Sequence, residues 1–470
     1  MGRALALDVT DAGVLGIGEG GKLVGPSPGY ALADGKTLLV GEEAFRCARL
    51  RPRFVMSRFW ERLDTKPLGR PFPRGLTAAD LVHAHLKSLW EKAGQGVGEV
   101  VLAVPGGLGS EALARLLGIA QALEMPVVGL VDTAVATTTA GFPGERLLLV
   151  DVHLHSATVT ELRQGDEIVA EGVSAIDRWG LDELRDTLAR RLAERFVLGT
   201  RYDPLHAAES EQALHDHLPA WLDRFERDDR AVLSLSDGGR NHEIEVSRDD
   251  VEEWARVYAE ELAQKVSLLK RPGEPTTLLV SARAARVPGL VARLSSMRSS
   301  EVVLVPEHAA AAGALREREA LRTGDEGLRF VTRLARREPS PEERSVGDGA
   351  LIRPPAVESA LPTTPTGVGG RPTHLLLGHL ARPLTAEPLV IGTAPPEESR
   401  QLRLDGETTG VSRAHCRLFE AGGEIVLEDL STYGTFLNGE RVVGRVVVAP
   451  GDRVRVGSPG VELRLIAAED

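Results

Sequence analysis

Residues 373–470 are broken into short apolar or alternating segments, each separated from the next by Gly, Pro, Asn or Asp. Short runs with such punctuation are typical of β strands. Asn438-Gly439 is a strong signal for a two-residue hairpin turn, because both residue types tolerate positive φ. The pattern therefore predicts a small antiparallel β sandwich. Its expected strands are 375–377, 389–391, 402–404, 416–419, 425–427, 435–437, 446–448, 454–456 and 461–466.

Two polar motifs lie in this region where the pattern predicts loops. The first is Gly410-Val-Ser-Arg-Ala-His415, and the second is Asp429-Leu-Ser-Thr-Tyr-Gly434-Thr. A serine hydroxyl donates a hydrogen bond to a phosphate oxygen, and an arginine guanidinium binds phosphate through a charge-assisted fork. The motifs therefore indicate a binding surface at one end of the sandwich.

In their order and spacing, these motifs and Asn438-Gly439 resemble the signature of forkhead-associated (FHA) domains, which read phosphothreonine. The resemblance implies that a phosphopeptide is contacted by Ser412, Arg413, Thr432 and Tyr433. It also implies structural roles for Gly392, His415, Gly434, Asn438 and Gly439. The imidazole of His415 is expected to brace its loop from beneath.

Two positions depart from the family's pattern. Thr393 follows Gly392 where the family usually has its main phosphate-anchoring arginine, and Tyr433 stands where an asparagine commonly holds the peptide backbone. Losing a charge-assisted contact typically costs about 1.5–3 kcal/mol. Arg400 or Arg403 would replace the missing guanidinium if the loop before them folds back. Phosphopeptide binding and a phosphate-independent protein contact therefore both remain open.

The overall composition excludes several classes of function. The chain has 470 residues, enough for two or three domains, and a formal net charge of -12 that argues against general binding to nucleic acid or acidic membranes. Its cysteines are Cys47 and Cys416, which excludes a disulfide framework and favours a reducing cytoplasm. No apolar run approaches the length of a membrane span, and Asp8 comes too early for a signal peptide.

The remaining sequence divides into a large α/β domain at 1–321 and a proline-rich linker at 322–372, before the β domain at 373–470. The linker is expected to be extended or disordered. Strands are expected at 4–9, 13–17, 100–104, 127–131, 147–152, 157–162, 277–281 and 302–305. Helices are expected at 110–122, 180–196, 249–269, 288–294 and 308–318.

The large domain resembles the actin-like ATPase superfamily, most closely the nucleotide-binding domain of the seventy-kilodalton heat-shock chaperones. The resemblance is carried by Val101-Leu-Ala-Val-Pro105, Val131-Asp-Thr-Ala-Val-Ala-Thr-Thr-Thr-Ala-Gly141 and Leu148-Leu-Val-Asp151. It implies an actin-like fold of two lobes. If the domain is active, the resemblance implies that the catalytic carboxylates are Asp8, Asp132 and Asp151. The positions of nucleotide contacts would be Asp8, Thr10, Asp151, Ser156, Ser281 and Arg286.

Phosphate binding in this superfamily depends on glycine-rich hairpins, because backbone N–H groups reach the phosphates only where side chains are absent. Those glycines are missing here. The first turn reads Asp8-Val-Thr-Asp-Ala, whose second carboxylate would repel phosphate. The second reads Asp151-Val-His-Leu-His-Ser156, with bulky side chains expected in the space of the phosphates. Since residues 280–286 have also lost a Gly-Gly pair, the three changes together predict a pseudo-ATPase.

A metal site is a weaker interpretation of the second turn. Alternation along a strand places His153 and His155 on one face with Asp151. Without a further ligand we interpret these histidines as ordinary polar residues and expect no metal.

These patterns lead to the hypothesis of a cytoplasmic, non-catalytic scaffold or adaptor: a pseudo-ATPase body joined to an FHA module. Its partners would be proteins, threonine-phosphorylated or not, and no cofactor is expected. The alternative hypothesis is a slow ATPase or nucleotide-dependent switch that binds ATP and magnesium through the retained carboxylates. The sequence leaves the oligomeric state open.

Overall fold

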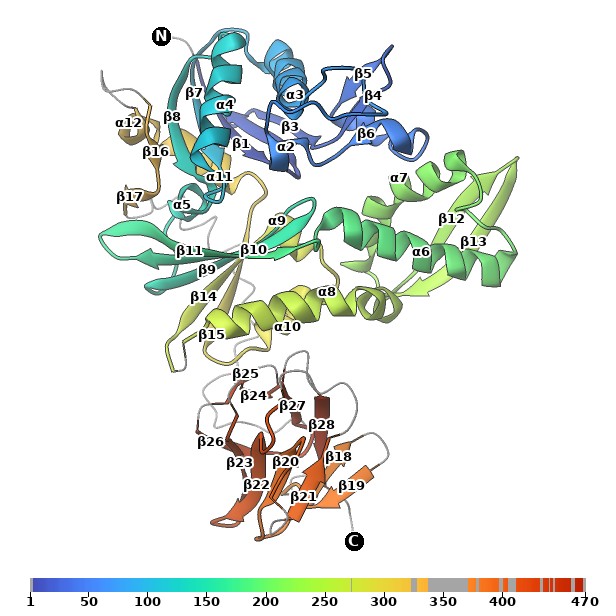
Figure 1. Cartoon of the computed structure of the whole chain (residues 1–470), viewed down its shortest axis with the longest axis vertical. Helices are drawn as coiled ribbons and strands as arrows, with labels where there is room; N and C mark the ends of the chain where they lie inside the picture. The colour runs from blue at the N-terminus through green and yellow to red at the C-terminus, as the bar shows by residue number, and fades with distance from the viewer. Residues whose placement is uncertain are drawn as a thin grey trace. The chain divides into compact units, whose positions relative to one another are not determined.

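The computed structural model describes residues 3–271, 273–322, 328–336, 371–377, 380–396, 400–404, 411–431, 434–438, 440–442, 444–457 and 461–467. The chain divides into two compact units. The larger comprises residues 1–262, 275–292 and 301–352, and the smaller comprises residues 263–274, 293–300 and 353–470. Figure 1 shows that the larger unit is of α/β type and that the C-terminal elements are strands.

The first sheet of the larger unit has the strand order β16-β8-β7-β1-β2-β3. Its first three strands along the chain form an antiparallel meander, and β7, β8 and β16 run parallel to β1. The bounds are β1 Arg3–Thr10, β2 Gly13–Gly18, β3 Leu23–Pro28, β7 Val97–Val104, β8 Val127–Asp132 and β16 Phe330–Val331. A separate small sheet is formed by β4 Ala31–Ala33, β5 Leu38–Val40 and β6 Val55–Met56.

The second sheet has the order β15-β14-β9-β10-β11-β17 and follows the same plan. Its meander is β9 to β11, and β14 runs parallel to β9. The bounds are β9 Arg146–Val152, β10 Ser156–Gln164, β11 Glu167–Asp177, β14 Thr276–Ser281, β15 Ser300–Val305 and β17 Arg333–Ala335. Asp8 near the end of β1 and Asp151 near the end of β9 therefore occupy corresponding places in the two sheets.

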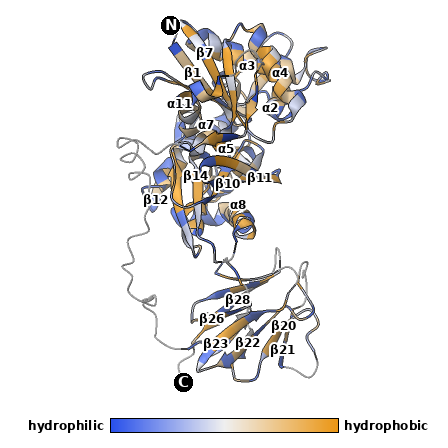
Figure 2. Cartoon of the chain, turned by 90° about the vertical axis from the view of Figure 1, so that its left-hand side faces the viewer, coloured by the Kyte–Doolittle hydropathy of each residue, from blue (hydrophilic) through white to orange (hydrophobic). Residues whose placement is uncertain are grey.

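Two layers of helices pack on the first sheet. The helices α2, α3 and α4 cover one face, in a core that includes Leu81, Leu102 and Leu116. On the other face α5 and α11 pack together and lie between the two sheets, in a core with Ala6 and Leu149 (Figure 1). The strands β1, β7 and β14 carry hydrophobic residues along much of their length (Figure 2). The bounds are α2 Phe59–Arg62, α3 Ala78–Ala93, α4 Ser110–Ala122, α5 Thr133–Thr138 and α11 Ala309–Arg316.

A hairpin of β12 and β13 packs on α6 and α7 at another part of the larger unit. The bounds are β12 Arg230–Asp237, β13 Arg240–Ser247, α6 Leu181–Thr200 and α7 Ala208–Phe225. The other helices are α1 Glu42–Phe45, the 3-10 helix Pro52–Phe54, α8 Arg248–Leu269, α9 Ala282–Ala285, α10 Leu290–Ser295 and α12 Arg318–Leu321.

One short segment after α12 joins both sheets. Within it, β16 extends the first sheet beside β8, and β17 extends the second beside β11. The expected start of the linker at residue 322 is therefore too early, because residues 330–335 form ladder hydrogen bonds with the body. The expected conformation of residues 337–370 lies outside the described residues.

The C-terminal strands form two sheets over one apolar core. One has the order β19-β18-β28-β27-β24-β25 and the other the order β21-β20-β22-β23-β26. Leu375, Ile391, Leu418 and Val454 are among the buried residues between them. The bounds are β18 His374–Leu377, β19 Leu380–Pro383, β20 Leu389–Gly392, β21 Arg400–Arg403, β22 Cys416–Ala421, β23 Glu424–Asp429, β24 Thr435–Leu437, β25 Glu440–Arg441, β26 Arg445–Val448, β27 Arg453–Val456 and β28 Val461–Ile466.

Most expected elements are present, and the differences have local causes. The expected sandwich was wholly antiparallel, but β20 and β21 run parallel, with Leu389 paired to Arg400 and Gly392 to Arg403. The helix expected at 180–196 continues to Thr200, where Arg201 adopts a left-handed conformation. We did not expect α3, although a capping box of Thr77 and Asp80 starts it.

Candidate functional site

The loop with Ser412 and Arg413 is held against the end of β20. The amides of Thr393 and Ala394 donate to the carbonyls of Ser412 and Arg413, each at 3.1 Å. A Cβ atom on Gly392 would lie 2.1 Å from the Arg413 carbonyl oxygen, closer than non-bonded atoms approach. This close contact therefore requires glycine at residue 392.

His415 connects this loop to the second one. It is fully buried, and its Nδ1 accepts a hydrogen bond from the Ser412 amide at 3.0 Å. Its Nε2 lies 3.0 Å from the Gly434 carbonyl oxygen and 3.2 Å from the Gly457 amide. Burial lowers the pKa of His415, which favours the neutral ring that this arrangement needs.

Asp429 orders the start of the second loop. One of its oxygens accepts from the Ser431 amide at 3.1 Å, the Ser431 hydroxyl at 2.8 Å and the Thr435 hydroxyl at 2.7 Å. The Gly434 amide donates to the Ser431 hydroxyl at 2.7 Å, and Gly434 has a φ of 96°. Both ends of the loop are therefore fixed. Thr432 and Tyr433, the residues between them, lie outside the described residues.

The predicted hairpin turn is present at the far end of β24. Leu437 pairs with Glu440, so two residues form the turn, and Asn438 has a φ of 53°. The side chain of Asn438 donates to Asp452 at 2.7 Å and accepts from the Arg453 amide at 2.9 Å. Gly439 lies outside the described residues.

The structure excludes Arg400 as the replacement for the missing phosphate-anchoring arginine. Its guanidinium donates to the Thr385 hydroxyl at 2.5 Å, the Pro383 carbonyl at 2.8 Å and the Glu387 carbonyl at 3.3 Å. These partners precede the start of β20, whereas the loops lie at its end. By contrast, Arg413 is exposed and Ser412 is half-buried at the loops themselves.

In the larger unit, Asp8 and Asp151 share Arg283, an arginine whose side chain is only 16% exposed. Arg283, just after β14, forks onto Asp151 with distances of 2.6 Å from Nη2 to Oδ2 and 3.2 Å from Nε to Oδ1. Its Nη1 lies 4.0 Å from Oδ2 of Asp8. The Ser281 hydroxyl donates to Asp151 at 2.5 Å, and the Thr133 hydroxyl donates to Asp8 at 3.2 Å. These five residues form one polar cluster.

The two carboxyl groups of the cluster differ in their affinity for protons. Burial raises the pKa of Asp8 to about 6, and the nearby charge of Arg283 only partly opposes this. Burial also acts to raise the pKa of Asp151, but the charges of Arg283 and His153 and hydrogen bonds outweigh it and lower that pKa. The guanidinium of Arg283 therefore stabilises the ionised form of Asp151 more than that of Asp8. Although burial opposes it, the pKa of Arg283 is raised by both carboxylates.

Asp11 in the first turn binds the backbone of the second turn. Its Oδ1 accepts from the Leu154 amide at 3.1 Å and its Oδ2 from the His155 amide at 3.3 Å. Nδ1 of His153 lies 3.6 Å from Oδ1 of Asp11. The carboxylate of Asp11 therefore occupies both of these hairpin amides.

The three bulky residues of the second turn point to different places. Only His153 lines the cavity beside the carboxylates, and its Nε2 lies 3.1 Å from the Thr158 hydroxyl. Leu154 is buried in a separate apolar cluster. His155 contacts the Ser57 hydroxyl at 3.0 Å and Glu183 at 3.3 Å. The expectation that all three would fill the phosphate space is therefore wrong for Leu154 and His155.

A cavity of about 260 Å³ collects several of the selected residues. It is lined in part by Thr10, Asp132, Asp151 and Ser156. Asp132 also caps α5, accepting from the Ala134 amide at 2.7 Å and the Val135 amide at 3.1 Å, and burial raises its pKa against these bonds. The carboxylate of Asp132 is thus already used in the fold.

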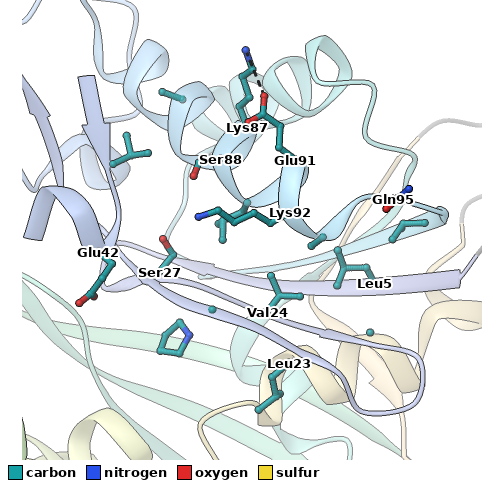
Figure 3. Close-up of a pocket in the computed structure, with 18 of the residues that line it drawn as sticks. Leu5, Leu23, Val24, Ser27, Glu42, Lys87, Ser88, Glu91, Lys92 and Gln95 are labelled. Atoms are coloured by element: carbon teal, nitrogen blue, oxygen red, sulfur yellow. Dashed lines mark ion pairs between the residues drawn. The ribbon is translucent and has the colours of Figure 1, made fainter. Parts of the chain in front are cut away.

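Arg286 is not part of this group. It lines a different cavity of about 320 Å³ and lies 3.6 Å from Glu307. A larger cavity, about 880 Å³, lies between the β1–β3 meander and α3, with Leu5 and Val24 facing Ser88 and Lys92 (Figure 3). None of the residues selected from the sequence lines that large cavity.

Sequence reasoning missed Arg283 and the role of Asp11. The signal for Arg283 was an arginine two residues after the apolar strand β14. Among the described residues, no group of three or more His, Cys, Asp or Glu side chains is arranged to hold a metal. Of the helices in the described part of the chain, none has the length and apolar character to cross a membrane.

Comparison with known families supports the geometry of the C-terminal loops. The family model of the FHA domain matches residues 389–457, which include β20, the braced loops and the Asn438 turn. The chain therefore contains an FHA domain at these residues. A comparison with curated proteins finds no match for the chain.

Proposed function

We propose that this protein is a non-catalytic adaptor whose FHA domain binds a threonine-phosphorylated protein. The observation that carries this proposal is the loop of Ser412 and Arg413, which is fixed at the end of β20 by Gly392 and by the buried imidazole of His415. A loop that is ordered before binding loses little entropy when a ligand arrives. FHA domains are protein-interaction modules that typically read phosphothreonine, which agrees with the family match.

The chemistry of the loop suits a phosphate. The phosphothreonine group carries nearly two negative charges and three acceptor oxygens. The exposed guanidinium of Arg413 supplies a charge-assisted fork, and the Ser412 hydroxyl supplies a neutral donor. An unmodified threonine offers neither the charge nor the acceptors, so the same loop would bind it weakly.

The test uses the full chain and a degenerate peptide library, made once with phosphothreonine and once with threonine at the fixed position. We expect binding only to the phosphorylated library. Ser412→Ala and Arg413→Ala should each lower the affinity about ten-fold or more. Arg382→Ala removes an exposed arginine from β19 and serves as the control, with unchanged affinity. Equal binding of both libraries, or of neither, would refute phosphothreonine recognition.

We infer further that the larger unit is an actin-like body that does not hydrolyse ATP. Its shared plan of two sheets, each with a meander and parallel strands, supports the resemblance to the actin-like superfamily. In that superfamily the corresponding carboxylates hold hydrated magnesium. Here Arg283 lies between Asp8 and Asp151, so the protein's own cation occupies the place of the metal.

Asp11 also supports the inference that ATP is not hydrolysed, through a negative charge where Arg283 has a positive one. Its carboxylate accepts from the two hairpin amides that would otherwise face a phosphate group. The residues present therefore do not fit magnesium and ATP: the cation position holds a guanidinium and the anion position holds a carboxylate. The guanidinium of Arg283 and the carboxylate of Asp11 already have partners within the protein. Magnesium and ATP would have to displace both of these side chains.

Calorimetric titration of the full chain with ATP and magnesium tests this inference. We expect no heat of binding for the unmodified protein, and no ATP-dependent rise in its melting temperature. Micromolar binding would overturn the pseudo-ATPase and favour the alternative, a slow ATPase or nucleotide-dependent switch. That alternative requires Arg283 to leave the carboxylates, so Arg283→Ala would then tighten binding, whereas the control Arg286→Ala would not produce this gain.

A further inference from the structure

The strand next to Gly392 carries an arginine, Arg403. β21 runs parallel to β20, and Arg403 is the register partner of Gly392. The amide of Leu404 donates to the Gly392 carbonyl at 2.9 Å, which fixes the register at this end of the strands. Neighbouring strands lie about 4.8 Å apart, so residue 403 is one strand spacing from the glycine that holds the phosphate loop.

The alternation of side chains decides the face on which Arg403 emerges. Leu402 and Leu404 are buried in the core of the sandwich, and Arg403 between them is exposed. Register partners in a sheet direct their side chains to the same face. Arg403 therefore leaves the sheet on the face to which a Cβ atom of Gly392 would point.

The loop with Ser412 and Arg413 lies on that same face of the sheet. A Cβ atom on Gly392 would meet the carbonyl oxygen of Arg413 at 2.1 Å and that of Ser412 at 2.8 Å. Arg403 and the Ser412–Arg413 loop thus share one face and one end of the sheet. Arg400, three residues earlier, falls on the opposite face and binds Thr385 and residues near it.

We propose that Arg403 supplies the second guanidinium of the phosphothreonine site, in place of the arginine that would stand at Thr393. Two guanidiniums and a hydroxyl, from Arg403, Arg413 and Ser412, would surround the phosphate group. Such forked donors match the charge and the geometry of phosphate better than a single lysine-like charge does. This proposal rests on the proposed phosphothreonine binding and depends on strand register.

The decisive comparison is between Arg403→Ala and Arg400→Ala in the full chain, titrated with the phosphothreonine peptide library. We expect Arg403→Ala to weaken binding about ten- to hundred-fold and Arg400→Ala to change it less than about two-fold. Arg403→Lys keeps the charge but loses the fork, so an intermediate loss is expected. Hydrogen exchange of the β20 and β22 amides checks that each variant is folded.

A restoration experiment separates binding from folding. Adding Thr393→Arg to the Arg403→Ala variant places a guanidinium at the family's usual position and should recover most of the lost affinity. If Arg403→Ala binds as the parent does while Ser412→Ala does not, the role of Arg403 is refuted and phosphothreonine binding stands. If the parent itself does not distinguish phosphorylated from unphosphorylated peptides, both proposals fail.

Discussion

Arg283 and Asp151 form a forked, buried ion pair between residues that are 132 positions apart in the chain. The side chains of Arg283 and Asp151 are 16% and 8% exposed, so water contributes little to solvating either charge. An ion pair in such surroundings is costly to break, because the remaining partner stays charged and unpaired. The pair therefore links the end of β9 to the segment after β14, and through Asp8 it also reaches β1.

Removing the guanidinium should destabilise the larger unit strongly. Arg283→Met leaves two carboxylates without their cation, and the expected loss of unfolding free energy is about 3–5 kcal/mol. Urea denaturation followed by tryptophan fluorescence measures this, because the five tryptophans all lie in the larger unit, at Trp60, Trp90, Trp179, Trp221 and Trp254. Arg286→Met, at an exposed pair, should cost less than about 1 kcal/mol. Equal losses for both variants would contradict the assigned role.

Asp8 should make the stability of the larger unit depend on pH. Its pKa is raised from 3.8 to about 6 in the folded state, so between these values the folded chain holds a proton that the unfolded chain has lost. Its contribution to stability therefore falls as the pH rises from about 4 to about 6. Relative to Asp8→Asn, the unfolding free energy of the parent should decrease by about 3 kcal/mol over this window. A difference that is constant between pH 4 and pH 7 would rule this out.

His415 should make the stability of the FHA domain depend on pH in the direction opposite to that of Asp8. Burial lowers the pKa of His415, so below about pH 6.5 the unfolded chain takes up a proton that the folded chain resists. Stability is therefore present at neutral pH and is lost as the pH falls. Scanning calorimetry of the full chain measures the stability of the FHA domain at each pH. Because all five tryptophans lie in the larger unit, the transition of the FHA domain is the one that leaves tryptophan fluorescence unchanged. His415→Gln should abolish the dependence, whereas His374→Gln should retain it.

Gly392 should tolerate no side chain. In Gly392→Ala the new methyl group would meet the backbone of Arg413, which cannot rotate away as a side chain would. We expect a loss of about 1–3 kcal/mol in the FHA domain and loss of phosphopeptide binding. Gly118→Ala is the matched control, because nothing lies near a Cβ atom at that helical position, and it should be neutral or slightly stabilising. Unimpaired peptide binding by Gly392→Ala would show that the loop is placed differently.

An external anion should be able to take the place of the Asp11 carboxylate at the two hairpin amides. Asp11→Ala frees the amides of Leu154 and His155, and inorganic phosphate at about 10 mM should then raise the melting temperature of the variant but not of the parent. Sodium chloride at equal ionic strength is the control. If phosphate stabilises both proteins equally, these amides are not the binding groups.

Local patterns allowed much of the fold to be predicted from the sequence. The helix Ser110–Ala122 and the strands Thr435–Leu437 and Val461–Ile466 have the predicted bounds, because apolar periodicity and turn residues act over only a few positions. Asn438 likewise determines a tight turn by its own conformational preference. The short strands β19 and β25 were not predicted, since strands of so few residues carry little periodic signal.

The chemistry of the candidate sites depended on contacts between distant residues. The sequence by itself determined that the FHA motifs are present and that Thr393 stands where the family usually has an arginine. Only the tertiary structure placed Arg403 beside Gly392, through a parallel pairing that no local pattern encodes. Only the packing of the two sheets brought Arg283 to Asp151 and Asp11 to the facing hairpin. Periodicity reports on neighbours in the chain, whereas the pairing of charges is decided by which strands and turns pack together.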